Sequence, residues 1–188
     1  DRGIRHAARV ALEKQPVANW KKKLLPETNP VIASAAMIAL ARADGKSSSD
    51  VLTKAMSLNY RTEKSWQQRI DLLRSITLAL TRGGEPQAEQ KKKLIAWLDR
   101  IYPASTPEEN RDLSAIMQFL QAPSAARKGM ALLRGASGQE EQIGYALNLR
   151  HLKSGWTSLL RESYFKWFAR AGNFKGGARL SNYLDGIK

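Results

Sequence analysis

Apolar residues recur at helical spacing along almost all of this 188-residue chain. In a first helix expected over residues 2–14, one face collects Ile4, Ala8, Ala11 and Leu12. No segment alternates apolar and polar residues over a strand's length, and no Asn-Gly or Asp-Gly turn joins two apolar runs. The spacing therefore predicts an all-α protein.

Local signals place the expected helix ends. Asn29 and Thr106 are predicted N-caps, each followed by a proline at the first helical position. Thr62 is the predicted cap of the longest helix, with Glu63 in its first turn, and Thr157 caps a later one. We expect ten or eleven helices, among them 2–14, 31–42, 139–152 and 180–187, with others beginning near 16, 48, 62, 86, 107, 124 and 157.

Many amphipathic helices with short connections are typical of helix-pair repeats. Helices that look like second members of pairs begin near residues 1, 29, 62 and 107, which gives offsets of about 28, 33 and 45 residues. The segment 1–12 resembles the HEAT-repeat pattern, in which Asp-x-x-(Val/Ile)-Arg is followed by Ala and Leu. This resemblance implies a right-handed α-solenoid of HEAT-like helix pairs, in which each pair buries a face against its neighbours.

We expect one HEAT-like domain over residues 1–188, with repeats in 1–137 and aromatic-rich C-terminal helices in 138–188. The chain lacks an initiator Met and its helical pattern is running by Ile4, so we expect a piece of a longer protein. The longest strongly apolar stretch, 31–41, is shorter than the ~20 residues of a membrane-spanning helix. No transmembrane segment is expected.

Most of the chain also resembles one bacterial protein family. The matching residues are Arg5 to Glu13, Tyr102-Pro103, Asn110 to Leu113, Gln139 to Ile143, Leu149 to Leu152, Gly155 to Thr157, Arg161, Tyr164-Phe165, Trp167-Phe168 and Lys175 to Gly177. They are similar to the helical domain of the membrane-bound dehydrogenase and c-type cytochrome multidomain family. In that family a dehydrogenase-like β-propeller is followed by HEAT-like repeats and a cytochrome module.

The resemblance implies a non-catalytic scaffold in a periplasmic or other extracytoplasmic redox protein, with other domains of the parent as partners. Haem is implied only for a neighbouring module, because this chain has no cysteine and therefore no Cys-x-x-Cys-His motif. A missing cysteine also excludes disulfides, thiolate metal sites and a cysteine nucleophile. A second departure is Gly144, where the family is expected to have histidine. We expect no cofactor in this chain, and oxidoreductase chemistry is not carried over.

The polar start of the helix at 139–152 is a first candidate interaction site. The helix dipole and the solvent explain its acidic and amide side chains without a function. Alternatively, they form a polar network with Arg150 and His151, which lie beside the face shared by Gln142, Tyr145 and Leu149. A catalytic role for a glutamate with His151 would need a metal or a third member that the sequence does not supply. The candidate residues are Gln139, Glu140, Glu141, Gln142, Arg150 and His151.

The dense aromatic group near the C-terminus is a second candidate. Core packing of the last helices is one interpretation, and a docking surface for another domain is the other. The candidate interaction residues here are Trp156, Tyr164 and Trp167.

Two lysine runs form the candidate basic surface. They are Lys21, Lys22, Lys23 and Lys91, Lys92, Lys93, each run near a tryptophan. A solvated helix face explains them, but they also suit a nucleic-acid backbone, anionic lipid or an acidic protein.

The positive charge of the chain, +14, is not continuous along the sequence. Residues 1–50, 51–100 and 151–188 carry net charges of +4, +5 and +5, whereas residues 101–150 are neutral. A continuous nucleic-acid track would also run through the middle, so docking onto an acidic partner or an anionic surface is favoured. A basic nucleic-acid-binding solenoid, similar to the HEAT-like DNA glycosylases, remains the alternative. An enzyme is the weakest hypothesis, because no nucleophile–base pair, metal cluster or phosphate loop is visible.

Overall fold

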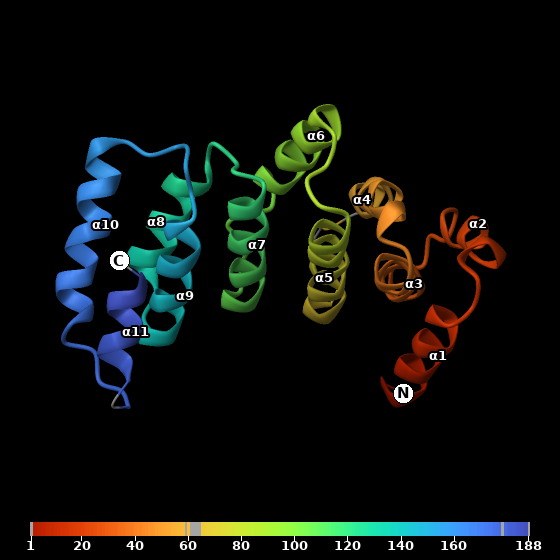
Figure 1. The fold of residues 1–188 in the computed structure, drawn as a ribbon, viewed down its shortest axis with the longest axis horizontal. Coiled ribbons are helices and arrows are strands. Elements are labelled where there is room, and N and C mark those ends of the chain that lie inside the picture. The colour runs from red at the N-terminus through yellow and green to blue at the C-terminus, as the bar shows by residue number, and fades with distance from the viewer. Residues whose placement is uncertain (1, 59, 61–64, 178, 188) are drawn as a thin grey trace. The chain divides into compact units, whose positions relative to one another are not determined.

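The computed structural model describes residues 2–58, 60, 65–177 and 179–187. Within these ranges the chain forms eleven α-helices, two short 3-10 helices and no strand (Figure 1), which confirms the all-α prediction. The helices are α1 (Arg2–Glu13), α2 (Lys21–Leu24), α3 (Pro30–Ala43), α4 (Ser48–Ser57), α5 (Trp66–Gly83), α6 (Ala88–Asp99), α7 (Pro107–Phe119), α8 (Ala125–Gly135), α9 (Gln139–Arg150), α10 (Ser158–Ala171) and α11 (Leu180–Ile187). The 3-10 helices are η1 (Val17–Asn19) and η2 (Gly45–Ser47).

The chain divides into two compact units. Unit 1 comprises residues 1–97 and unit 2 comprises residues 98–188, so the boundary falls inside α6. The expected single repeat domain, with its division after residue 137, stays a prediction.

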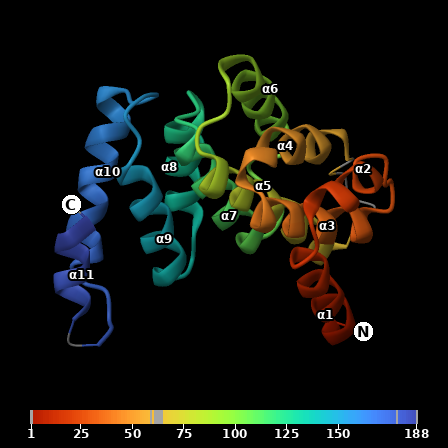
Figure 2. The same cartoon turned by 45° about the vertical axis from the view of Figure 1, so that its right-hand side comes forward.

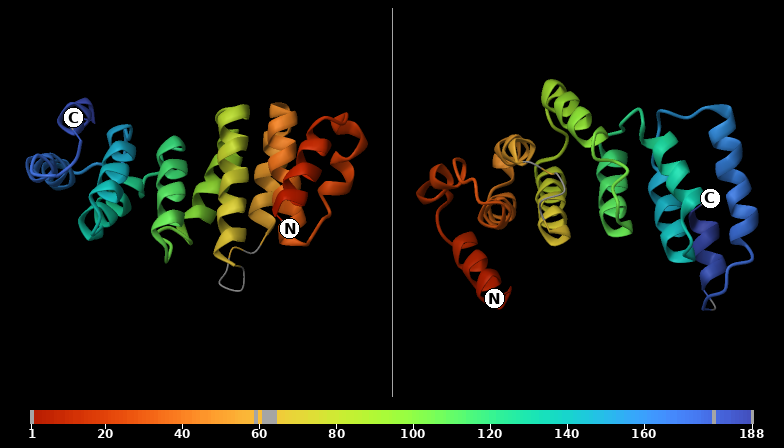
Figure 3. Two further views of the ribbon diagram at one scale, coloured as in Figure 1. Left: turned by 90° about the horizontal axis from the view of Figure 1, so that it is seen from below. Right: turned by 180° about the vertical axis from the view of Figure 1, so that it is seen from behind.

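In unit 1, α3 is the central helix. It packs against α1, α2, α4 and α5, and α4 also packs against α5. In Figure 1, α1, α3 and α5 form the lower row of this unit and α2 and α4 lie above them. Figure 3 (left) shows the same three lower helices, in red, orange and yellow, side by side. The core between the rows contains Met37, Leu40, Leu52, Leu73 and Ile76, all fully buried.

In unit 2, α9 is the central helix. It packs against α7, α8 and α11, while α10 packs against α8. Figure 2 shows α7, α8 and α9 next to one another, with α10 and α11 (blue) beyond them. The core of this unit contains Leu113, Ile116, Met130, Tyr145 and Trp167.

Several of the predicted helix caps are confirmed. Asn29 accepts hydrogen bonds from the backbone N–H groups of the first turn of α3, and Thr106 and Thr157 cap α7 and α10 in the same way. The predicted cap of the longest helix, Thr62 with Glu63, lies outside the described residues. The structure begins α5 at Trp66, and a reciprocal capping box joins Ser65 and Gln68 there.

The apolar face expected for α1 is not the face that packs against α3. Ile4, Ala8 and Ala11 are exposed, with Ile4 at 72%, whereas Arg9 and Glu13 are largely buried. The Glu13 carboxylate bridges to α3, because its Oε2 lies 3.0 Å from Arg42 Nε while its Oε1 lies 3.3 Å from Arg9 Nε. Helical spacing identifies residues that share a face, but it does not determine which face meets the neighbouring helix.

None of the helices in the described residues is long and apolar enough to cross a membrane.

A close approach between α4 and α5 supplies a test of this packing. A Cβ atom at Gly83 would lie 2.0 Å from Ser48 Oγ, so we expect Gly83→Ala to lower the free energy of unfolding by about 1–3 kcal/mol. Gly144→Ala is the matched control, because no described atom lies within 4 Å of a Cβ built there. It should raise the stability by up to about 1 kcal/mol, since alanine is the better helix former. Urea unfolding followed by circular dichroism measures both, and wild-type stability for Gly83→Ala would contradict the packing described here.

Candidate functional site

The polar residues predicted at the start of α9 hold unit 2 together. Gln139 binds the backbone of Lys175, accepting from its N–H (2.9 Å) and donating to its carbonyl (3.2 Å). Gln142 donates to the carbonyl of Ala136 (2.8 Å) and accepts from Trp167 Nε1 (2.9 Å). The two glutamines therefore join α9 to its own N-terminal loop, to α10 and to the loop after α10.

The acidic residues of this turn are differently placed. Glu141 accepts a hydrogen bond from the Tyr145 hydroxyl (2.9 Å), whereas Glu140 is exposed. Burial, followed by the hydrogen bond to Glu141, raises the pKa of Tyr145 well above its ordinary value. Glu140, Glu141, Gly144 and Tyr145 line a pocket of about 220 Å³, so the position expected to hold histidine opens onto this pocket.

Two of the three candidate aromatic residues belong to the core. Trp167 is fully buried, and its ring meets Phe168 edge-on at 5.0 Å between centroids. Tyr164 is also buried and donates to the carbonyl of Ala146 (3.0 Å). Burial raises the pKa of Tyr164 to about 12. Trp156 is half-buried, so it is the one of the three with an accessible ring.

Arg150 and His151 end α9. The Arg150 guanidinium donates to the carbonyl of Gly186 in α11, and the carbonyl of His151 accepts from Gln121 Nε2 (3.0 Å). The His151 side chain is exposed, and the hydrogen bond of Glu141 goes to Tyr145. The described contacts of Gln139, Glu141 and Gln142 go to other partners than Arg150 and His151, so the predicted polar network between the two ends of α9 stays a prediction.

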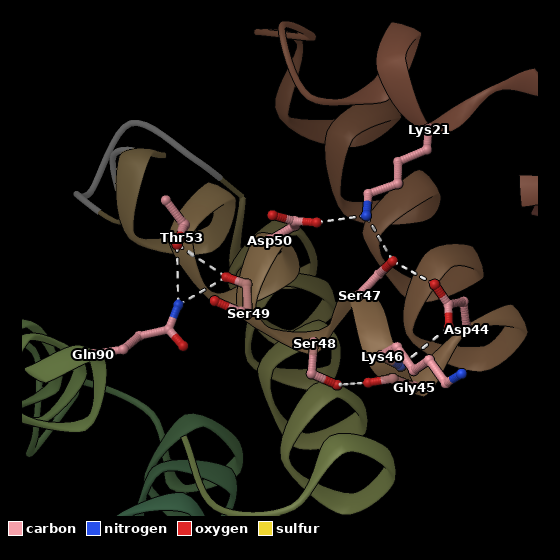
Figure 4. Close-up of polar contacts among 10 residues, drawn as sticks. All are labelled: Lys21, Asp44, Gly45, Lys46, Ser47, Ser48, Ser49, Asp50, Thr53 and Gln90. Atoms are coloured by element: carbon pink, nitrogen blue, oxygen red, sulfur yellow. Dashed lines mark hydrogen bonds and ion pairs between the residues drawn. The ribbon is translucent and has the colours of Figure 1, made fainter. Parts of the chain in front are cut away.

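Half of the predicted basic surface is used inside unit 1. Figure 4 shows that Lys21 Nζ lies 2.6 Å from Asp50 Oδ2 and donates to Ser47 Oγ (2.8 Å). Lys91 pairs with Glu85, and Lys93 lies 3.7 Å from Glu89. The remaining lysines, Lys22, Lys23 and Lys92, are exposed.

In the polar cluster around Lys21, Ser47 contacts both Lys21 and Asp44, as a serine nucleophile would contact a base, but its environment does not suit catalysis. Ser47 donates to Asp44 (2.6 Å), and this hydrogen bond is the main reason that the pKa of Asp44 is lowered. Ser47 is only 1% exposed, so a substrate has no access to its hydroxyl. The cluster instead fixes the start of α4, and on the other side of that helix Gln90 donates to Ser49 and Thr53 (Figure 4).

A basic groove is the feature that sequence analysis missed. It has a volume of about 370 Å³ and runs over the inner faces of α1, α3 and α5. Its polar lining is Arg5, His6, Arg9, Gln67, Asp71 and Arg74, and its apolar floor is Val31, Ala35, Ile38 and Ile70. The spacing of Arg5, His6 and Arg9 places them on one side of α1 and could have indicated a basic surface. It indicates a groove only together with the packing of that polar side toward α3, which the sequence does not give.

The cations of this groove differ in how they are held. Arg9 is fixed, because it pairs with Glu13 and its Nη2 donates to His6 Nδ1 (3.0 Å). Arg5 and Arg74 are exposed, and neither makes an ion pair with a residue that the structure describes. In the described part of the chain, the groove therefore offers two guanidinium groups without an ion-pair partner beside a fixed one. Among the described residues, no group of three or more His, Cys, Asp or Glu side chains is arranged to hold a metal ion.

The Gln142–Trp167 hydrogen bond supplies a test of the structural role assigned to α9. Gln142→Leu leaves the buried Trp167 N–H without an acceptor, so we expect a loss of about 1–3 kcal/mol in the free energy of unfolding. Trp167→Phe should cost less in the Gln142→Leu background than in the wild type, because the unpaired N–H is then absent. The exposed Glu140→Gln is the control and should change stability by less than about 0.5 kcal/mol. Equal effects of Gln142→Leu and Glu140→Gln would refute the structural role.

Comparisons with known proteins add no assignment. No family model matches the chain, and neither a curated protein nor a solved structure matches it. The HEAT-repeat pattern and the dehydrogenase–cytochrome family therefore enter only as proposals. Function is inferred from the geometry of the groove and from the chemistry of its side chains.

Proposed function

We propose that this chain is a non-catalytic helical-repeat module that binds an acidic segment of a partner protein. The observation that carries the proposal is the groove over α1, α3 and α5, where Arg5 and Arg74 are free for a ligand and Arg9 is held in place.

The composition of the groove favours a protein partner over a phosphate backbone. Asp71 and Gln67 stand among the cations, and the floor is apolar. A protein segment with carboxylates, a basic or amide group and apolar side chains can satisfy all three kinds of surface. A nucleic-acid backbone gains from the cations alone and is repelled by Asp71.

We further propose that the helices are arranged as a right-handed solenoid of HEAT-like pairs. The contacts of α3 with α1, α4 and α5 support this arrangement in unit 1, because α3 packs both on a helix that precedes it and on the two helices that follow it in the chain. The resemblance of residues 139–177 favours a place between a dehydrogenase-like propeller and a c-type cytochrome module of an extracytoplasmic bacterial protein. Haem would belong to that neighbouring module.

The groove is tested with two polyanions and a charge-matched control. Fluorescence anisotropy at 50 mM salt compares binding of labelled poly-L-glutamate and of a labelled 20-base-pair DNA duplex to the full chain. The double variant Arg5→Gln/Arg74→Gln should weaken polyglutamate binding about tenfold, since two exposed charge-assisted contacts are lost.

The control for this experiment is Lys22→Gln/Lys23→Gln, which removes the same charge from exposed positions of unit 1 outside the groove lining. It should change the affinity much less. Equal losses in both variants would show that net charge alone drives binding and would overturn the groove. Tight, salt-sensitive binding of the duplex without binding of polyglutamate would replace the proposal by the nucleic-acid alternative.

The family proposal has a separate test in the reading frame that encodes this chain. We expect a β-propeller sequence before these residues and a Cys-x-x-Cys-His motif after them. A reading frame with neither would exclude the dehydrogenase–cytochrome family and would leave the groove proposal untouched.

A further inference from the structure

Unit 2 contains a second basic site with a different chemistry. A pocket of about 240 Å³ lies where the end of α9 meets α10. Two leucines line it together with six larger side chains, Arg150, Lys153, Trp156, Arg161, Tyr164 and Phe165. No carboxylate occurs among the described residues of this lining, in contrast to the groove of unit 1.

Three cations surround the pocket. Lys153 and Arg161 are exposed, and neither has an ion-pair partner in the part of the chain that the structure describes. Arg150 uses one N–H group on the carbonyl of Gly186 and keeps its other donors. The three positive charges are therefore not neutralised within the lining, and they attract an anion.

The aromatic side chains present ring surface to the pocket. The Tyr164 hydroxyl donates to Ala146 and the Trp156 N–H donates to Leu152 (3.0 Å), so both polar groups are already satisfied by backbone carbonyls. The Trp156 and Tyr164 rings lie 5.4 Å apart between centroids, and the Phe165 ring lies 5.8 Å from Tyr164. Phe165 is 61% exposed, so its ring is accessible to a ligand.

The loop that carries Lys153 is held in position. Gln121 donates to the carbonyl of His151 and accepts from the N–H of Lys153 (2.8 Å), while its own carbonyl accepts from Ser154 Oγ (3.2 Å). Gln121 has a φ of 52°, a conformation that residues other than glycine rarely adopt. Gly155 follows in the same loop, and a Cβ atom there would lie 2.4 Å from the carbonyl oxygen of Pro123. The position of the Lys153 backbone is thus fixed by the fold.

We propose that this pocket binds one nucleotide of a single-stranded nucleic acid, with the base against the Phe165 and Trp156 rings and the flanking phosphates on Lys153, Arg161 and Arg150. Exposed rings beside unpaired cations are the combination that single strands require, because each nucleotide brings a flat base and a phosphate. A nucleotide brings a flat base together with each negative charge, whereas the carboxylate side chain of an acidic peptide brings no ring. The inference concerns another unit and another class of ligand than the groove, and it extends beyond the proposed function.

The size of the pocket agrees with one nucleotide of a longer strand. Sites that enclose a whole small molecule usually have volumes of about 300–1,000 Å³, more than the 240 Å³ found here. The strand would continue past the pocket on either side.

The test uses the full chain and a fluorescein-labelled 12-mer of thymidylate, with anisotropy measured at 50 and 200 mM NaCl. Phe165→Ala should weaken binding at least about fivefold, the loss of one base stack, and should leave the salt dependence unchanged. Lys153→Gln/Arg161→Gln should weaken binding about tenfold and should reduce the salt slope by about 0.7 per lost phosphate contact. The substituted residues are exposed, so the variants are expected to fold, which circular dichroism verifies.

Matched controls are available within unit 2. Tyr183→Ala removes another exposed ring, and Arg170→Gln/Lys175→Gln removes two exposed cations, all outside the pocket lining. These variants should bind the 12-mer like the wild type. Losses as large as those of the pocket variants would overturn the site.

Further probes separate the nucleotide from other anions. An abasic 12-mer should bind more weakly than the thymidylate 12-mer, and equal binding would overturn the proposal because stacking would then contribute nothing. Full competition by poly-L-glutamate at matched charge would overturn it in favour of an acidic peptide, and no binding at 50 mM NaCl would overturn it outright. Arg5→Gln/Arg74→Gln should leave 12-mer binding unchanged, which separates failure of this site from failure of the groove.

Discussion

Each amphipathic helix of this chain has an apolar stripe, and without a sheet in the described residues only another helix can cover it. Two helices, α3 and α9, cover the apolar stripes of several others. In unit 1, α3 is buried nearly all round, from Ala33 to Ala41, and therefore contacts four other helices. In unit 2, α9 has the same position between α7, α8 and α11. The helices that pack around these two do so with one face each, so their opposite faces can carry polar residues.

The two basic sites follow from this arrangement in different ways. The groove of unit 1 forms because α1, α3 and α5 lie side by side and leave their polar edges facing one space, which is why cations and a carboxylate occur together there. The pocket of unit 2 forms at a turn between consecutive helices, where ring surface that is not needed for the core remains accessible. The two lysine runs contribute less than expected to a basic surface, because Lys21, Lys91 and Lys93 pair with acidic neighbours.

The features that could be predicted from the sequence are those decided within a few residues. The caps at Asn29, Thr106 and Thr157 depend on a side chain and the next turn of backbone, and all three were predicted correctly. The inward face of α1 depends on Arg42 of another helix, and the function of Gln142 depends on Trp167, so neither follows from local spacing. The groove requires Arg5 and Arg74 to meet across three helices, which only the tertiary structure determines.

The strained backbone of Gln121 has a consequence for ligand binding. Glycine would adopt its φ of 52° at no steric cost, but it would lose the side-chain hydrogen bonds of Gln121 to Gln118, His151 and Lys153. Without these bonds the loop of Lys153 would have to be ordered when a ligand binds, which would cost conformational entropy. The hydrogen bonds that offset the strain at Gln121 therefore also lower the entropic cost of binding at Lys153.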